Sequence, residues 1–298
     1  MNLLITGAWD RASNAAPLIR EMGHNVVLLQ QEADALPCPA EWVEGVICNA
    51  LFSYHPIETF PNLRFIQLTS AGFDRVPMEQ VRARGIEIHN AGDVYSIPMA
   101  EHAIACALWF YRGLGAFRDN QRAHVWEKRR DLKELKGSPV LIIGCGRVGT
   151  ACAKAFKVLG CQVFGIDAEI RTDASFSEIQ GIDGLEDGLK MADIVVVSLP
   201  LTQETRHVLS HRELSAMKDG TLLINISRGA VVDTAALSDH LSRLGGVALD
   251  VFEEEPLDRD DPLWDQENVL ITPHNSFVGD GNSERLQAVI MGNLRKAK

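Results

Sequence analysis

The sequence lacks an excess of cationic residues. Its 298 residues contain 29 Lys and Arg against 40 Asp and Glu, so the formal net charge is −11. Nucleic acids and anionic membranes both attract cationic surfaces, and we therefore expect neither as a partner. A small anionic substrate remains compatible with this charge, because one local arginine can dominate a small pocket.

Targeting and metal-binding signals are also missing. No apolar run approaches the roughly 20 residues needed to span a bilayer, and residues 1–7 are too short and uncharged for a signal peptide. The six cysteines contain no CxxC pair and no metal-ligand spacing. We therefore expect no metal site, and buried free thiols in a reducing cytoplasm.

What the sequence does contain is an alternation of short apolar runs and helical stretches, the pattern of parallel sheets covered by helices. A long helix over about 98–123 is predicted to connect two domains, and a final helix covers about 284–295. The near-continuous apolar character of the later strands is typical of burial on both faces. The predicted strands are 3–6, 25–29, 45–48, 64–67, 86–89, 139–143, 162–166, 193–199, 221–226, 246–251 and 268–272.

The predicted fold class is therefore α/β, with two doubly wound parallel-sheet domains. A Rossmann dinucleotide-binding domain over 98–274 is inserted in a smaller, flavodoxin-like substrate-binding domain made of residues 1–97 and 275–298. Loops at the carboxyl ends of the strands bind ligands in such sheets, so a site is expected in a cleft between the domains.

A glycine-rich motif, Gly144-Cys145-Gly146-Arg147-Val148-Gly149, follows a predicted strand and opens a predicted helix over 148–159. Gly144 would permit the tight turn, Gly146 the approach of backbone to a pyrophosphate, and Gly149 the packing of helix on strand. A chance glycine turn is the alternative interpretation.

Asp167 lies 18 positions after Gly149 (167 − 149), where another predicted strand ends. A carboxylate there can accept hydrogen bonds from both adenosine ribose hydroxyls and repel a 2′-phosphate, which favours NAD over NADP. The nearby Arg171 could weaken that preference. The N-terminal Thr6-Gly7 resembles a second dinucleotide loop, but Trp9 follows where further glycines should be, so we expect an ordinary turn.

Three successive strand ends each supply one reactive group: Arg228, Glu255 and His274. The guanidinium can hold a carboxylate bidentately and polarise an adjacent carbonyl. The imidazole can carry a proton near neutral pH, and a neighbouring carboxylate would favour its charged form. Glu253 and Glu254 are expected to be solvated loop charges.

In the first domain, Ser70-Ala71-Gly72 follows a predicted strand. Small residues allow close backbone approach, so the N–H groups of Ala71 and Gly72 could bind a carboxylate. A plain tight turn explains the same residues.

Together these residues resemble the D-isomer-specific 2-hydroxyacid dehydrogenase family over nearly the whole chain. Motifs that carry the resemblance include Ser70-Ala71-Gly72, Glu101-His102, the glycine loop, residues 225–229, Glu255-Pro256 and Thr272-Pro273-His274. The resemblance implies that Arg228 binds the carboxylate and carbonyl of a 2-oxo acid, that His274 is the general acid/base, and that Glu255 orients His274. It also implies NAD(H) as the cofactor, a homodimer, and a backbone grip on the substrate carboxylate at Ala71 and Gly72.

The resemblance further implies contacts to the cofactor. The residues concerned are Gly144, Gly146, Arg147, Val148 and Gly149 at the pyrophosphate, Asp167 at the ribose, Pro200 and Thr205 at the adenosine, Ile226, and Asp250 at the nicotinamide amide. The chain departs from the family pattern at Asn275-Ser276-Phe277, where an aliphatic residue and a small pair are usual.

The predicted function is thus NAD(H)-dependent interconversion of a 2-oxo acid and a D-2-hydroxy acid, with glyoxylate or hydroxypyruvate as the first guess from the resemblance. One alternative is an NAD(H)-sensing, corepressor-like binding protein, although retention of all three reactive residues favours an enzyme. A phosphite-type dehydrogenase is another. Glu255 argues against a formate dehydrogenase, which should carry glutamine beside the histidine.

Overall fold

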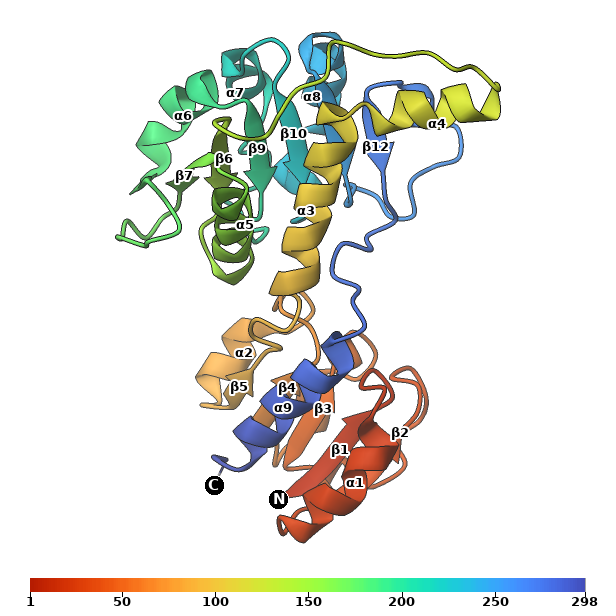
Figure 1. Ribbon diagram of the computed structural model, residues 1–298. Coiled ribbons are helices and arrows are strands. Elements are labelled where there is room, and N and C mark those ends of the chain that lie inside the picture. Colours follow the sequence, from red (N-terminus) through yellow and green to blue (C-terminus); the bar gives the residue numbers. More distant parts are fainter. Residues whose placement is uncertain (298) are drawn as a thin grey trace. The chain divides into compact units, whose positions relative to one another are not determined.

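The computed structural model describes residues 1–297, which divide into two α/β units (Figure 1). One unit is Met1–Tyr95 together with the chain from Gly279, and the other is Ser96–Val278. These boundaries lie two and four residues from the expected ones at 97 and 274. The two units are described separately below.

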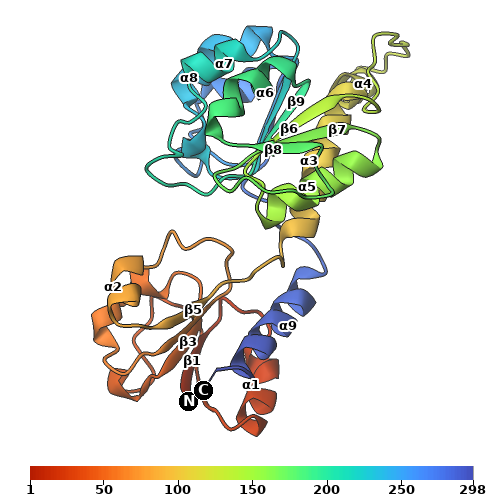
Figure 2. The same cartoon turned by 90° about the vertical axis from the view of Figure 1, so that its left-hand side faces the viewer.

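The first unit is built on a five-stranded, all-parallel sheet in the order β2-β1-β3-β4-β5. Helices cover both faces: α1 and α9 pack on one, and α2 lies on the other (Figure 2). The strands are β1 (Asn2–Thr6), β2 (Asn25–Leu29), β3 (Gly45–Cys48), β4 (Phe65–Leu68) and β5 (Glu87–His89), and the helices α1 (Ala12–Glu21), α2 (Met78–Ala83) and α9 (Asn282–Leu294).

The turn after β1 is not a phosphate loop. A Cβ on Gly7 would lie 2.2 Å from the carbonyl oxygen of Gln30, and the indole of Trp9 is fully buried. Since side chains and backbone fill the space that a phosphate would need, the expected ordinary turn is confirmed.

The second unit contains a seven-stranded parallel sheet in the order β12-β11-β10-β9-β6-β7-β8, a doubly wound arrangement in which the strand order reverses between β6 and β9. The strands are β6 (Pro139–Ile143), β7 (Gln162–Ile166), β8 (Glu178–Gln180), β9 (Ile194–Val197), β10 (Leu222–Asn225), β11 (Gly246–Leu249) and β12 (Val269–Ile271). The helices are α3 (Ser96–Tyr111), α4 (Leu114–Arg122), α5 (Arg147–Val158), α6 (Leu185–Met191), α7 (His211–Ala216) and α8 (Thr234–His240).

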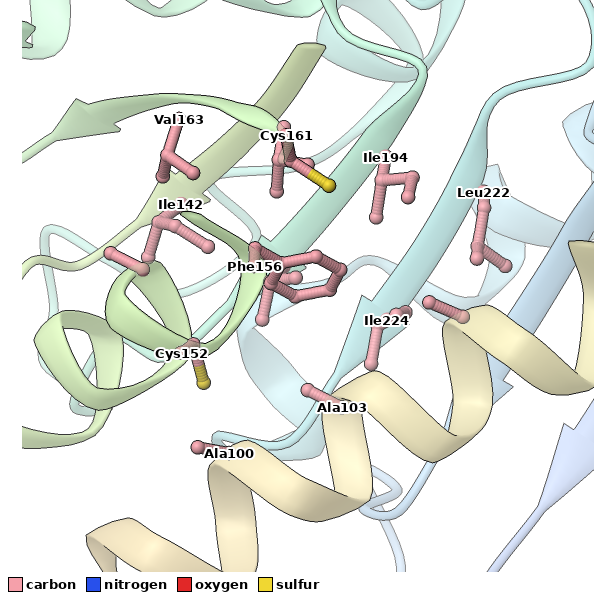
Figure 3. Close-up of a cluster of buried hydrophobic side chains, with 14 of the residues drawn as sticks. Ala100, Ala103, Ile142, Cys152, Phe156, Cys161, Val163, Ile194, Leu222 and Ile224 are labelled. Carbon is pink, nitrogen blue, oxygen red and sulfur yellow. The ribbon is translucent and has the colours of Figure 1, made fainter. Parts of the chain in front are cut away.

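Two hydrophobic clusters hold this sheet between its helices. On one face α3 and α5 pack together, and Phe156 of α5 lies among Ala103 of α3 and the strand residues Ile142 and Ile224 (Figure 3). Alanines on α3 let the two helices approach closely, and burying Phe156 contributes roughly 1.5–3 kcal/mol. Helices α6, α7 and α8 cover the other face.

The prediction of two parallel-sheet α/β domains is confirmed, with two local corrections. The single helix predicted over 98–123 is wrong, because the chain breaks at Gly113, whose φ of 61° interrupts the helix between α3 and α4. The three-residue edge strand β8 was not predicted. All six cysteines are free, and every one except Cys38 is buried.

Candidate active site at the strand ends of the second unit

Three neighbouring strands place Arg228, Glu255 and His274 along one edge of the sheet. Strands β10, β11 and β12 are adjacent and parallel, with Asn225 opposite Leu249 and Leu249 opposite Ile271. Because the three strands end level with one another, the segments carrying the three side chains leave the sheet at the same edge.

His274 and Glu255 form a hydrogen-bonded pair. Nδ1 of His274 lies 2.7 Å from Oε2 of Glu255, and the other carboxylate oxygen accepts the backbone N–H of Phe252 at 3.0 Å. An ionised carboxylate can only accept, so Nδ1 of the imidazole donates and Nε2 is left to exchange a proton. Both side chains are a little more than one-third exposed, so solvent and small molecules can reach them.

The backbone of His274 is held by Asp250. The N–H of His274 donates to the carbonyl oxygen of Asp250 at 2.7 Å, and His274 adopts a left-handed φ of 50°. The buried Asp250 carboxylate accepts the Thr272 hydroxyl at 2.6 Å and the backbone N–H groups of Asn275 and Ser276 at 2.7 and 2.9 Å. Asp250 therefore fixes the loop in which the catalytic candidate lies.

The residues that depart from the family pattern are part of this loop. Asn275 and Ser276 use only their backbone N–H groups to bind Asp250, so their side chains are not required for that contact. The Phe277 ring packs edge-on against the His274 imidazole, with centroids 6.0 Å apart and an interplanar angle of 87°. The phenylalanine therefore limits the rotation of the imidazole.

Arg228 follows β10 in a tightly packed turn. Its side chain is half-buried, and its Nη1 donates to the carbonyl oxygen of Ser227 at 2.8 Å. A Cβ on the next residue, Gly229, would lie 1.9 Å from the carbonyl carbon of Phe252. The Arg228 turn is therefore in direct contact with the loop that carries Glu255.

The glycine-rich loop has the geometry of a phosphate cradle. Gly144 has a left-handed φ of 93°, and a Cβ on Gly149 would lie 1.9 Å from the Gly144 carbonyl oxygen. A Cβ on Gly146 would meet no atom within 4 Å, so the approach to the start of α5 is open there. Arg147 and Val148 begin that helix, whose first N–H groups favour an anion.

Asp167, directly after β7, is fixed beside this loop. Its carboxylate accepts the backbone N–H of Cys145 at 2.6 Å and that of Glu169 at 2.9 Å. The Arg171 guanidinium donates to the Cys145 carbonyl oxygen. The carboxylate of Asp167 and the guanidinium of Arg171 thus lie beside the same loop, at the position expected for the adenosine ribose.

The remaining predicted cofactor residues follow β9 and β10. Thr205 Oγ1 donates to the Pro200 carbonyl oxygen at 2.6 Å, which closes the loop after β9. Ile226 is buried directly after β10. All these loops leave the same edge of the sheet as the Gly144 loop.

Ala71 and Gly72 belong to the first unit, where they follow β4. Asn90 Nδ2 donates to the Ala71 carbonyl oxygen at 2.6 Å, and Ser70 Oγ donates to that of Gly72 at 3.1 Å. Both bonds use carbonyl groups, so neither of them occupies the N–H group of Ala71 or Gly72.

Comparison with known proteins identifies the family. A family model described as the NAD-binding domain of D-isomer specific 2-hydroxyacid dehydrogenases matches residues 104–276. The glyoxylate reductase of Thermococcus gammatolerans is 34% identical over 291 residues, which cover 93% of this chain and 84% of that protein. The chain belongs to the D-isomer-specific 2-hydroxyacid dehydrogenases.

Other relatives agree with this assignment. The (S)-sulfolactate dehydrogenase of Chromohalobacter salexigens is 31% identical over 242 residues, 80% of this chain and 78% of that one. The crystal structure of a family member from Aeromonas salmonicida has a TM-score of 0.85 at 27% identity and covers 99% of this chain and 95% of that one. This protein is therefore an NAD-dependent 2-hydroxyacid dehydrogenase.

One polar contact of the dehydrogenase was not predicted from its sequence. Glu253, expected to be a solvated charge, lies with Oε2 2.9 Å from Nε2 of His207 and accepts the backbone N–H of Thr234 at 3.1 Å. Burial, the largest single influence, opposes ionisation, but the hydrogen bonds from His207 and Thr234 outweigh it and the pKa of Glu253 is lowered. Forty-six residues separate the partners (253 − 207), and no sequence pattern signals such a contact.

Across residues 1–297 of the dehydrogenase, no group of three or more His, Cys, Asp or Glu side chains is arranged to hold a metal ion. None of the helices in that part of the chain combines the length and the apolar character that crossing a membrane requires.

Proposed function

We propose that this dehydrogenase interconverts a 2-oxo acid and a D-2-hydroxy acid with NAD(H), using His274 as the general acid/base, Glu255 as its orienting partner and Arg228 as the carboxylate- and carbonyl-binding residue. The observation that carries the proposal is the 2.7 Å pair of His274 and Glu255 on the sheet edge that also bears Arg228 and the Gly144 loop.

The cofactor, when bound, supplies or takes up the hydride at C2 of the acid. In the reducing direction, Arg228 would stabilise the negative charge that develops on the carbonyl oxygen. Nε2 of His274 would then deliver the proton that completes the hydroxyl group, while Glu255 stabilises the imidazolium and keeps the ring in place. Oxidation reverses each proton step.

The chain's own residues fit the cofactor. The open space at Gly146 supports a pyrophosphate at the start of α5, with Arg147 and Val148 contributing their backbone N–H groups, while Gly144 and Gly149 allow the close backbone packing that shapes the loop. We assign Asp167 to the ribose, Pro200 and Thr205 to the adenosine side, Ile226 to the coenzyme, and Asp250 to the nicotinamide amide. Ala71 and Gly72 would grip the substrate carboxylate through their N–H groups.

The first experiment is a panel of 2-oxo acids with NADH and with NADPH, running from glyoxylate and hydroxypyruvate to bulky aromatic acids. We propose glyoxylate or hydroxypyruvate as substrates because relatives carry the names glyoxylate reductase and glyoxylate/hydroxypyruvate reductase. Chiral analysis of the product tests the D configuration. NADH binding without turnover of any acid would contradict the proposal, and phosphite belongs in the panel to test the alternative substrate class.

Substitution of His274 tests the proton-transfer role. His274→Ala should lower kcat by about 10² to 10⁴, the usual contribution of a general acid. Arg228→Ala should raise KM and lower kcat together, because the guanidinium would serve both binding and the transition state. The control is Glu254→Ala, one residue from Glu255 and exposed. Wild-type kinetics in either test variant would remove that residue from its role.

For the cofactor we propose a preference for NAD(H) over NADP(H). The Asp167 carboxylate would repel a 2′-phosphate, and its two hydrogen bonds to backbone N–H groups fix it in place. Two observations speak for a modest preference. Arg171 lies beside the same loop as Asp167, and a structural relative from Xanthobacter autotrophicus was solved in complex with NADPH. Asp167→Ala should reduce the ratio of the kcat/KM values for NADH and NADPH, and a wild-type ratio below one would contradict the preference.

We also propose a homodimer in the cytoplasm. The segment after α4 presents a Trp126 side chain that is 95% exposed beside the exposed Val125, and a second copy of the chain would cover this apolar surface. Light scattering should give twice the chain mass, and Trp126→Ser with Val125→Ser should shift it toward the monomer. The free thiols support a reducing compartment, which localisation of the tagged protein would test.

A further inference from the structure

His207, Glu253 and Thr234 form a hydrogen-bonded clamp across three neighbouring loops. His207 follows β9, Thr234 begins α8 after β10, and Glu253 follows β11. The Glu253 carboxylate binds both partners, Nε2 of His207 at 2.9 Å and the backbone N–H of Thr234 at 3.1 Å. One side chain therefore ties the loops of β9, β10 and β11 together.

The turn that carries Arg228 lies inside this clamp. The N–H of His207 donates to the Ala230 carbonyl oxygen at 2.8 Å, which attaches one side of the turn to the β9 loop. On the other side, a Cβ on Gly229 would lie 1.9 Å from the carbonyl carbon of Phe252 and 2.3 Å from the nitrogen of Glu253. The turn is thus fixed between the loops that Glu253 joins.

The same loop also carries the acid/base partner. Glu255 is two residues beyond Glu253, and its Oε1 accepts the Phe252 N–H at 3.0 Å. His207 has a φ of 53°, a backbone conformation that residues other than glycine rarely adopt. Burial opposes ionisation of Glu253, but the hydrogen bonds from His207 and Thr234 lower its pKa, as expected for bonds that favour the ionised carboxylate.

We propose that Glu253 is a positioning residue, which holds Arg228 and the Glu255–His274 pair in fixed register through its bonds to His207 and Thr234. It does not touch the reacting atoms. This inference rests on the roles proposed above for Arg228 and His274. Its expected consequence is a loss of turnover when the clamp is opened, because small displacements of catalytic groups are costly to the rate.

The test compares Glu253→Ala with Glu254→Ala in the intact enzyme. Glu254 is the matched control, since it is an exposed carboxylate in the same loop for which residues 1–297 show no hydrogen bond or ion pair. Glu253→Ala should lower kcat about 10- to 100-fold and raise KM for the 2-oxo acid, the range expected for a misplacement of about 1 Å. Glu254→Ala should match the wild type, and NADH affinity, measured by fluorescence, should be the same in all three proteins.

Two further variants separate positioning from folding. Glu253→Gln should recover most of the lost kcat, because its amide oxygen can still accept the Thr234 N–H. His207→Asn keeps a residue that tolerates the left-handed backbone and removes the imidazole, so it should repeat part of the Glu253→Ala effect. In the double variant the two losses should not multiply, since each change opens the same clamp. If Glu253→Ala does not fold, Glu253→Gln and His207→Asn decide the question.

The outcomes distinguish this inference from the proposed function. Wild-type kcat and KM in Glu253→Ala and His207→Asn, with only a lower Tm, would mean a purely structural clamp and would overturn the inference. Lost NADH affinity would also overturn it, because the effect would then act through the cofactor. His274→Ala is measured alongside: full activity there refutes the proposed roles themselves, whereas an inactive His274→Ala beside an unaffected Glu253→Ala refutes only the positioning role.

Discussion

The left-handed backbone of His274 predicts an unusual order of stability among its variants. The φ of 50° is maintained while the His274 N–H donates to the Asp250 carbonyl oxygen at 2.7 Å. His274→Ala and His274→Gly remove the same imidazole and lose the same contacts to Glu255 and Phe277. The two variants therefore differ only in what their backbones prefer.

The magnitude follows from two opposing effects. A residue with a Cβ pays about 1–2 kcal/mol for the left-handed conformation, and glycine avoids this cost. Glycine loses more conformational entropy on folding, about 0.5–1 kcal/mol relative to alanine. His274→Gly should therefore be as stable as His274→Ala, or more stable by up to about 1.5 kcal/mol.

At a residue with a negative φ, the alanine variant should instead be more stable than the glycine variant. Arg228 supplies the control, because it lies at the same sheet edge with a φ of −140°. Arg228→Gly should be less stable than Arg228→Ala by about 0.5–1 kcal/mol. The paired comparison thus isolates the backbone conformation from the loss of a functional side chain.

Thermal unfolding measures both pairs. In a unit of this size, 1 kcal/mol corresponds to about 2–4 °C in Tm, which calorimetry resolves. Both His274 variants should also be nearly inactive, so activity cannot account for the difference in stability. A His274→Ala protein that melts above His274→Gly would refute the assignment of a strained backbone to His274.

Three further predictions concern the loop glycines and the pH dependence of stability. Gly149→Ala should weaken NADH binding and lower Tm, because the new Cβ would meet the Gly144 carbonyl oxygen at 1.9 Å, whereas Gly146→Ala, in open space, should keep its Tm; equal Tm values would contradict the packing argument. Burial raises the pKa of the Cys152 thiol to about 12, so the folded protein keeps a proton that the unfolded chain loses above about pH 9; the free energy of unfolding should fall as pH rises from there, and less steeply in Cys152→Ala. Burial lowers the pKa of His102, with Asp250 partly offsetting it, so stability should fall as pH drops below about 6.5, and His102→Gln should show a flatter profile in urea unfolding.

The sequence predicts the sheets well because the strands are nearly continuous apolar runs. Strands such as β6 and β7 begin and end at the predicted residues, since a parallel strand buried on both faces leaves a clear signal. The edge strand β8 has three residues, two of them exposed, and therefore leaves none. The break between α3 and α4 depends on the conformation of one glycine, which periodicity alone does not reveal.

The candidate site, like the fold, could be predicted from the sequence only in part. Arg228, Glu255 and His274 could be grouped from the sequence because each follows a recognisable strand, and parallel strands end at one edge. The clamp through Glu253 could not, because it depends on a contact with His207 that exists only in the folded chain. The support that Asp250 gives to His274 likewise needs the register of β11 against β12.

The discontinuous first unit has a consequence for how this enzyme can change. Arg228, Glu255, His274 and the glycine loop all come from the contiguous stretch Ser96–Val278, whereas Ala71 and Gly72 belong to the other unit. Under the roles proposed above, substitutions around Ala71 and Gly72 should therefore alter which acid is accepted while the proposed proton-transfer residues and their supports remain intact. Laboratory evolution toward a new acid should accordingly concentrate its early substitutions before Ser96, and exchange of the whole first unit between relatives should transfer acid preference without transferring coenzyme preference.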